Sequence, residues 1–238
     1  MQRGNWTTMR ELGRGGQGVT YLAENTISIY ALLDTIRKAV KFLGASVSTG
    51  SENANLSQSR ALAESIKSFS TTWEQTGISA LKVLHENIRR DQKAITRLRQ
   101  EIEVLHSNSH SHILKIIDSS PSEGWFAASY YPMKTLTDNL TRFRGQPLMA
   151  LEAIRPLVDA VAGLHRHKII HRDIKPDNIF VSDEGLILGD FGLVFFADEA
   201  KSRISDTYEN VGSRDWMPPW AYGKRVEDLT PSFDVFAL

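Results

Sequence analysis

The sequence predicts an α+β fold, with short antiparallel strands and amphipathic helices in separate stretches of the chain. Three observations carry this prediction. A glycine-rich stretch runs directly into a β-prone segment over 12–23. Apolar residues alternate along 76–84, which indicates a strand. Along 90–106 and 148–167 they recur every three or four positions, which indicates helices.

The composition narrows the class of protein. The chain has 238 residues, no cysteine, and 28 Lys plus Arg against 28 Asp plus Glu. A balanced charge gives no global field for nucleic acid or an anionic membrane surface, and the missing cysteines exclude disulfides and thiolate metal sites. No window approaches the run of about 18 apolar residues that a membrane span requires. We therefore expect a soluble, cytoplasmic chain without nucleic-acid or membrane contacts.

The glycines at the N-terminal end can bring a backbone turn close to phosphate oxygens. Gly13, Gly15 and Gly18 have the G-x-G-x-x-G spacing, and Thr20 lies in the β-prone segment that follows. A dinucleotide-binding fold would have a helix there instead. A plain glycine hairpin stays the alternative interpretation.

The stretch from about 25 to 75 predicts an insertion. Its segment 27–43 has a helical period, 44–59 is rich in Ser, Asn and Gly like a linker, and 62–69 predicts a second short helix. Two interpretations remain, namely a surface insertion and a docking or regulatory element.

The strand over 76–84 carries one lysine, Lys82, among apolar residues. In the following helix Glu101 lies within the apolar stripe, between Leu98 and Leu105. A carboxylate on a buried stripe is costly unless it is paired, so Glu101 is the expected partner of Lys82.

Lys41 and Arg97 provide two alternatives to this pairing. Lys41 lies in a similar apolar run but has no comparably placed glutamate, and Arg97 could form a weak surface pair with Glu101. A small cluster of histidines could suggest a metal site but fits a connecting loop better: His106, His110 and His112.

Two short apolar runs, 179–181 and 186–188, are separated by Ser-Asp-Glu-Gly and predict a hairpin. Asn178 and Asp190 would then meet at its open end, where amide and carboxylate oxygens can hold Mg²⁺ beside substrate phosphates. Asp173, on the loop that enters this end, could accept the proton of an attacking hydroxyl. Lys175 could reach the transferred phosphoryl group.

These residues resemble, position for position, the catalytic and metal-binding loops of the eukaryotic-type (Hanks-type) serine/threonine protein kinases. The resemblance implies a bilobal fold, with a small antiparallel sheet and the C helix in an N-terminal lobe and a mainly helical C-terminal lobe. It places the lobes at 1–131, with the insertion, and 132–238. The second would be a partial lobe that ends at the start of the family's F helix, so a C-terminally truncated catalytic domain is expected.

The resemblance implies ATP and Mg²⁺ as ligands and a protein Ser or Thr hydroxyl as acceptor. The residues with catalytic roles would be Asp173, Lys175, Lys82 and Glu101. Nucleotide binding would involve Gly13, Gly15, Gly18, Thr20, Ala80, Lys82, Ser129, Tyr131, Phe180 and Asp190. The metal ligands would be Asn178 and Asp190.

The connections around these motifs follow the same resemblance. Strands are predicted over 113–117 and 125–131, and the second leads into the hinge with Ala128 as gatekeeper. His171 is expected to pack against Phe191 and Leu105 rather than to act in acid–base chemistry. Trp220 departs from the family, which has a glutamate there that pairs with an arginine in a later helix.

The segment 193–211 matches an activation loop. Phosphorylation of this loop, with Arg172 as the partner of the phosphate, stands beside a constitutively ordered loop. The loop contains four hydroxyl side chains: Ser202, Ser205, Thr207 and Tyr208.

The expected function is transfer of the ATP γ-phosphate to protein Ser or Thr, because independent motifs occur in the family's order. Two alternatives remain. One is a non-catalytic, kinase-like binding module, and the other is a small-molecule phosphotransferase of the aminoglycoside type.

Overall fold

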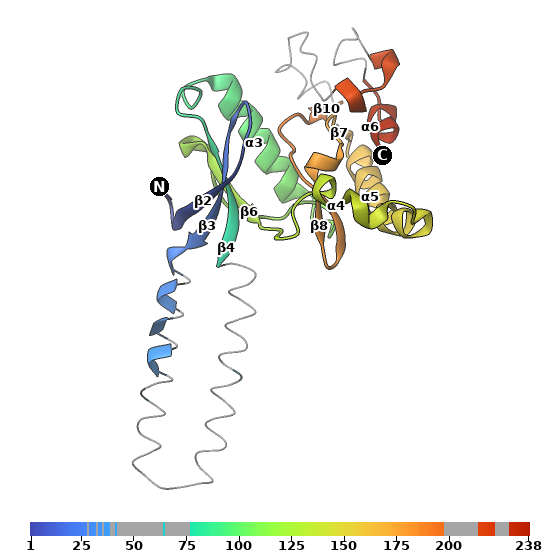
Figure 1. Ribbon diagram of the computed structural model, residues 1–238. Helices are drawn as coiled ribbons and strands as arrows, with labels where there is room; N and C mark the ends of the chain where they lie inside the picture. The colour runs from blue at the N-terminus through green and yellow to red at the C-terminus, as the bar shows by residue number, and fades with distance from the viewer. Residues whose placement is uncertain are drawn as a thin grey trace, which may run out of the picture. The chain divides into compact units, whose positions relative to one another are not determined.

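The computed structural model describes residues 1–27, 29–31, 33–34, 36–38, 41, 64, 77–197, 214–221 and 229–238. Contacts divide the chain into two compact units (Figure 1). The first comprises Met1–Val83 and Ala127–Tyr130, and the second comprises Leu84–Phe126 and Tyr131–Leu238. The α+β class predicted from the sequence is confirmed.

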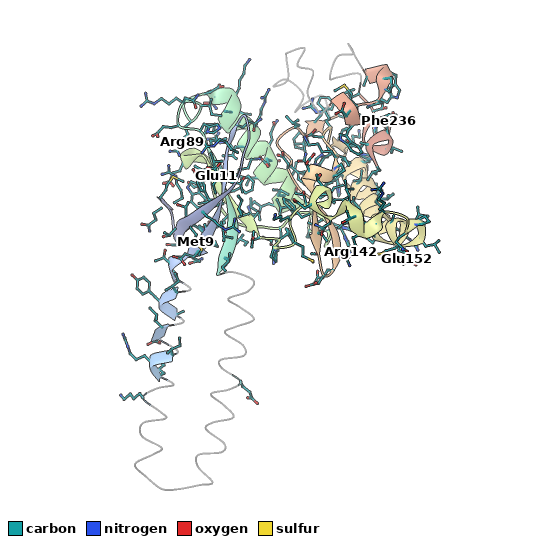
Figure 2. The ribbon with its side chains drawn as sticks, in the orientation of Figure 1. Met9, Glu11, Arg89, Arg142, Glu152 and Phe236 are labelled. Carbon is teal, nitrogen blue, oxygen red and sulfur yellow. The ribbon has the colours of Figure 1, made fainter. Side chains whose placement is uncertain are left out.

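The first unit is built on antiparallel strands. The short strand β1 (Gln2–Arg3) pairs with β2 (Trp6–Arg14), which pairs with β3 (Gly18–Asn25). Next to β3 lies β4 (Ile78–Leu84), and the sheet order is β1-β2-β3-β4-β6-β5. On β4 every second residue from Ser79 to Val83 is buried. On β2, Glu11 (labelled in Figure 2) and Arg14 form an exposed ion pair of 2.7 Å.

The last two strands of the sheet are β5 (Ile116–Ser120) and β6 (Trp125–Ser129), joined by the 3₁₀ turn η1 (Pro121–Glu123). The predicted strand over 113–117 is wrong at its start. Backbone bonds tie the chain there to strand β9 (Gly185–Leu188) instead, since Leu114 N donates to Leu188 O at 2.8 Å and Leu188 N donates to His112 O at 2.9 Å.

The strand predicted over 125–131 is two residues too long. It ends at Ser129, and Tyr131 begins a turn in which its carbonyl oxygen accepts a bond of 3.1 Å from Lys134 N. The chain therefore bends at the end of β6, before the next helix begins.

Helix α3 (Gln92–Ser107) begins at Asp91, whose carboxylate accepts a bond from Lys93 N at 2.9 Å. Helix α4 (Leu136–Phe143), which the sequence analysis did not predict, begins with a capping box between Thr135 and Asp138. Helix α5 (Pro147–Arg166) continues through Pro156. A last short helix is α6 (Ser232–Ala237).

The second unit also contains two small sheets. The predicted hairpin is confirmed as β8 (Ile179–Ser182) and β9 (Gly185–Leu188). The other sheet pairs β7 (Ile169–Ile170) with β10 (Phe195–Phe196). Helix α5 contacts both β7 and β9, and it supplies four fully buried side chains to the core: Leu157, Ala160, Val161 and Leu164.

Several predictions fall wholly or largely outside the described residues. These are the linker 44–59, the helix 62–69 apart from residue 64, and the four hydroxyl residues of the activation loop. The described residues between 26 and 41 are helical, and among them Lys41 is exposed. No described helix is long and apolar enough to cross a lipid bilayer.

Candidate active site

The β8–β9 hairpin brings Asn178 and Asp190 to one end. Its register pairs Ile179 with Leu188, so Asn178 stands opposite Gly189, whose N–H donates to Asn178 O at 2.8 Å. Asp190 follows directly. Its φ of 54° lies in the left-handed region, which aspartate tolerates better than most residues. The predicted meeting of these two residues at the open end of the hairpin is confirmed.

Asp173 is the centre of a tight polar group. Its Oδ2 accepts a bond of 2.9 Å from Lys175 Nζ and one of 2.8 Å from Asn178 Nδ2. Asn178 Nδ2 also donates to Asp173 O at 2.8 Å. Asp173 is only 7% exposed, so its orientation is fixed by these donors rather than by solvent. Such a carboxylate can receive the proton of an acceptor hydroxyl at Oδ1.

The oxygen atoms of Asn178 and Asp190 are suitable ligands for a hard metal ion. Both hydrogen bonds use its Nδ2, so the amide oxygen Oδ1 is the atom that a metal ion can take. Asp190 adds a carboxylate from the neighbouring strand end. Oxygen ligands from one or two side chains, together with phosphate oxygens, are what Mg²⁺ takes in nucleotide sites.

A buried carboxylate, Asp234 on α6, fixes the backbone of the loop that carries Asp173. It accepts bonds from His171 N at 2.8 Å and Arg172 N at 2.9 Å, and its Oδ2 also binds His165 Nε2 at 2.8 Å. Asp234 is 1% exposed, and hydrogen bonds to a buried charge are stronger than neutral ones. Asp234 of α6 therefore holds the backbone of this loop in place at His171 and Arg172.

His171 has a structural role in this loop. Its Nε2 donates to Gly189 O at 3.1 Å and its Nδ1 accepts from Asp173 N at 3.3 Å, which defines a neutral ring. Complete burial lowers the pKa of His171 from its ordinary value, against the opposing effect of Asp234. The ring also meets Phe191 edge to face, with 4.7 Å between centroids. The predicted packing against Phe191 is confirmed, and the contact with Leu105 stays a prediction.

The side chain of Arg172 contacts two residues of the segment after Asp190. Its Nε donates to Leu193 O, and its guanidinium lies 5.9 Å from the centroid of Phe195. The residue is 8% exposed and has φ of 69°, a backbone conformation that β-carbon crowding disfavours. These contacts tie the residue before Asp173 to the segment that follows Asp190.

Lys82 and Glu101 are placed as their sequence patterns predict. Lys82 lies on β4 in the first unit, half-buried on the same face as Ala80. Glu101 lies on α3 in the second unit and is 1% exposed, whereas Glu103 is exposed. Their ion pair stays a prediction. Lys41, the rejected alternative, has an exposed side chain.

The glycine stretch forms a turn between β2 and β3. Gly15 N donates to Gly18 O at 2.9 Å, and a Cβ atom at Gly13 or Gly15 would meet no other atom within 4 Å. Thr20 pairs with Gly13 in the ladder, at the base of this turn. This open space beside the backbone suits the approach of phosphate oxygens. Ser129, predicted to bind the nucleotide, is the last residue of β6.

Phe180 on β8 packs between an aromatic ring and a glycine. Its ring stacks on Tyr131 with 5.4 Å between centroids and 20° between planes. A Cβ atom at Gly189 would lie 2.5 Å from Phe180 Cε2, so only glycine fits at this position. These contacts fix the ring of Phe180, one of the predicted nucleotide-binding residues.

The histidines of the α3–β5 connection serve a local role. His112 Nδ1 donates to Leu186 O at 2.7 Å, and His110 Nδ1 accepts from His112 N at 3.2 Å. Within the part of the chain that the structure describes, no three His, Cys, Asp or Glu side chains gather to hold a metal ion. The connection is therefore tied to β9 through His112.

Taken together, the sheet with its glycine turn, helix α3, and the loop that enters the β8–β9 hairpin define a protein kinase fold. A sequence profile described as "Protein kinase domain" matches residues 66–238, which is more than half of the chain. The chain belongs to the protein kinase domain family.

Several curated relatives are similar over about two thirds of the chain. The probable serine/threonine-protein kinase PknB of Lactococcus lactis is 31% identical over 167 residues, 67% of this chain and 25% of the relative. Serine/threonine-protein kinase AfsK of Streptomyces coelicolor is 26% identical over 162 residues, 67% of this chain and 20% of the relative. PrkC of Bacillus subtilis, another serine/threonine-protein kinase, is 30% identical over 163 residues, again 67% of this chain, and 24% of the relative. The chain thus spans about a fifth to a quarter of their length.

Sequence reasoning missed two residues that shape the site. Asp234 is a single carboxylate in the apolar run 233–238, the same signal that singled out Glu101 on its helix. Gly189 carries no comparable signal, because its need for a missing side chain depends on where Phe180 lies.

Proposed function

We propose that this chain is the catalytic domain of a serine/threonine protein kinase, which transfers the ATP γ-phosphate to a protein Ser or Thr hydroxyl. The single observation that carries the proposal is the group at Asp173, with Lys175 Nζ at 2.9 Å and Asn178 Nδ2 at 2.8 Å from its Oδ2. A carboxylate, a cation and a metal-binding amide in one loop match the needs of in-line phosphoryl transfer. The named kinase relatives support the same acceptor chemistry.

Each residue has a defined task in this proposal. Asp173 orients the acceptor hydroxyl and receives its proton, while Lys175 stabilises charge on the transferred phosphoryl group. Lys82, oriented by Glu101, positions the nucleotide phosphates. Asn178 and Asp190 would hold Mg²⁺, which when bound neutralises charge on the phosphates.

We also propose that residues 1–131 act as the nucleotide-binding lobe and residues 132–238 as the lobe with the catalytic loop. The nucleotide would contact the glycine turn and the remaining predicted residues: Thr20, Ala80, Ser129, Tyr131 and Phe180. Photolabelling with an azido-ATP tests this assignment, since labelled peptides should come from 1–131 and from β8. Because the proposed reaction consumes ATP, we place it in the cytoplasm.

The test is an acceptor comparison with labelled Mg-ATP and the full chain. Three acceptors are offered in parallel: a Ser/Thr peptide library, a Tyr peptide library and an aminoglycoside mixture. We expect label in phosphoserine or phosphothreonine, and none above the Asp173→Asn background with the other two acceptors. Label on the aminoglycoside alone, or ATP binding without transfer to any acceptor, would contradict the proposal.

A further inference from the structure

The segment 214–221 is anchored to the second unit by apolar packing. It contains two short turns, η4 (Arg214–Trp216) and η5 (Pro219–Ala221). Met217 and Ala221 of this segment belong to one buried cluster with residues of the β7–β10 sheet and α6. The other members of the cluster are Ile170, Phe195 and Phe233, with Leu229 packed against it. Ile170 directly precedes the loop that carries Asp173. The segment therefore packs against the strand that leads into the loop carrying Asp173.

Trp220 makes an aromatic contact between this segment and α6. Its ring stands at 88° to the ring of Phe233, with 6.4 Å between centroids. Trp220 is 41% exposed, whereas Phe233 is 3% exposed. An edge-to-face pair of this geometry favours one orientation of the two rings beyond simple burial.

The partner ring is adjacent to the carboxylate that holds the catalytic loop. Phe233 precedes Asp234 in α6, and Asp234 binds His171 N and Arg172 N at 2.8 and 2.9 Å. One short helix thus binds the catalytic loop through a carboxylate and the segment 214–221 through a ring. Since neighbouring residues of a helix have a fixed spacing, the two attachments have a fixed spacing too.

We infer that Trp220 is a positioning residue, whose ring contact with Phe233 sets the place of segment 214–221 beside the catalytic loop and so governs acceptance of the protein substrate. The inference rests on the proposed function, because it concerns the acceptor of that reaction. Trp220 would act through Phe233 and not through contact with the substrate. The glutamate that the kinase resemblance predicts at this position would act through an ion pair, which salt screens, whereas a ring contact is not weakened by such screening.

The test combines amide exchange with steady-state kinetics on the full chain. In Trp220→Ala, exchange of the amides in 214–221 should become faster, while His171 N and Arg172 N stay protected by Asp234. The KM for a Ser/Thr peptide should rise roughly two- to tenfold, as expected for loss of one aromatic pair. The KM for ATP should stay within about twofold of the wild type.

Matched variants separate the ring from other features of the residue. Trp220→Phe retains an aromatic edge and should keep the peptide KM near the wild-type value. Trp220→Glu, which restores the charge expected from the resemblance, should behave like Trp220→Ala. Val235→Ala on the same helix is the control, because Val235 is 62% exposed, and it should change neither readout.

Three results would overturn the inference: unchanged exchange in 214–221, faster exchange without a change in peptide KM, and a loss that affects the KM for ATP and the protection of His171 equally. The exchange measurement needs no activity. An inactive wild type would therefore refute the proposed function and the acceptance step, while exchange would still decide whether the ring contact holds the segment.

Discussion

Replacing Asp234 with asparagine should destabilise the second unit strongly. The carboxylate is 1% exposed and accepts three hydrogen bonds of 2.8 to 2.9 Å, two at Oδ2 and one at Oδ1. In its best orientation an asparagine keeps its oxygen toward the pair of donors and turns its amide N–H toward Arg172 N. One bond to a buried charge is then lost, at about 1.5–3 kcal/mol, and the other two weaken by about 1 kcal/mol each. The expected loss is about 3.5–5 kcal/mol of unfolding free energy.

Urea unfolding of the full chain, followed by circular dichroism, measures this loss. Asp183→Asn is the matched control, because it makes the same chemical change at an exposed residue in the turn between β8 and β9. The control should stay within about 0.5 kcal/mol of the wild type. If Asp234→Asn lost no more than the control, Asp234 would not anchor the catalytic loop and the reasoning would be refuted.

Three further predictions concern the site. Asp190→Asn and Lys82→Met should each slow phosphoryl transfer at least ~10²-fold, about 2.7 kcal/mol of barrier, and a variant with the wild-type rate would remove that residue from the proposed chemistry. His171→Gln should remove an acid-dependent loss of stability. Because the pKa of His171 is lowered in the folded chain, the unfolded chain binds a proton first as the pH falls. Stability is therefore intact above about pH 6.5 and falls by up to about 1.4 kcal/mol per pH unit below it. Equal slopes for variant and wild type in urea unfolding would contradict this. Gly189→Ala should cost about 1–3 kcal/mol, because its Cβ would lie 2.5 Å from a Phe180 ring carbon, and an unchanged unfolding free energy would show that the ring moves aside freely.

The hairpin and the helices were predictable because their signals are local. The apolar runs of 179–188 fixed the register that brings Asn178 to the strand end, and the helical stripe placed Glu101 on the buried face of α3. Both predictions depend on periodicity within one element. The sequence alone was enough to find them.

The errors arose where distant segments exchange backbone bonds. A strand was expected to begin at Ile113, but Leu114 bonds to Leu188 in the hairpin. The end of β6 depends likewise on the turn that Tyr131 forms with Lys134. The hydrophobic pattern predicts that a residue is buried but not which strand it pairs with. Neither the start of the strand expected at 113 nor the end of β6 could therefore be predicted from the sequence.

Single-turnover transfer from labelled Mg-ATP to a Ser/Thr peptide, by the wild type and by Asp173→Asn, tests the proposed reaction most directly. The asparagine keeps the size of Asp173 but cannot receive a proton, so it separates folding from chemistry. We expect phosphoserine or phosphothreonine from the wild type and a rate lower by at least ~10²-fold from the variant. Equal rates in the two proteins would contradict the assignment of Asp173 and the reaction built on it.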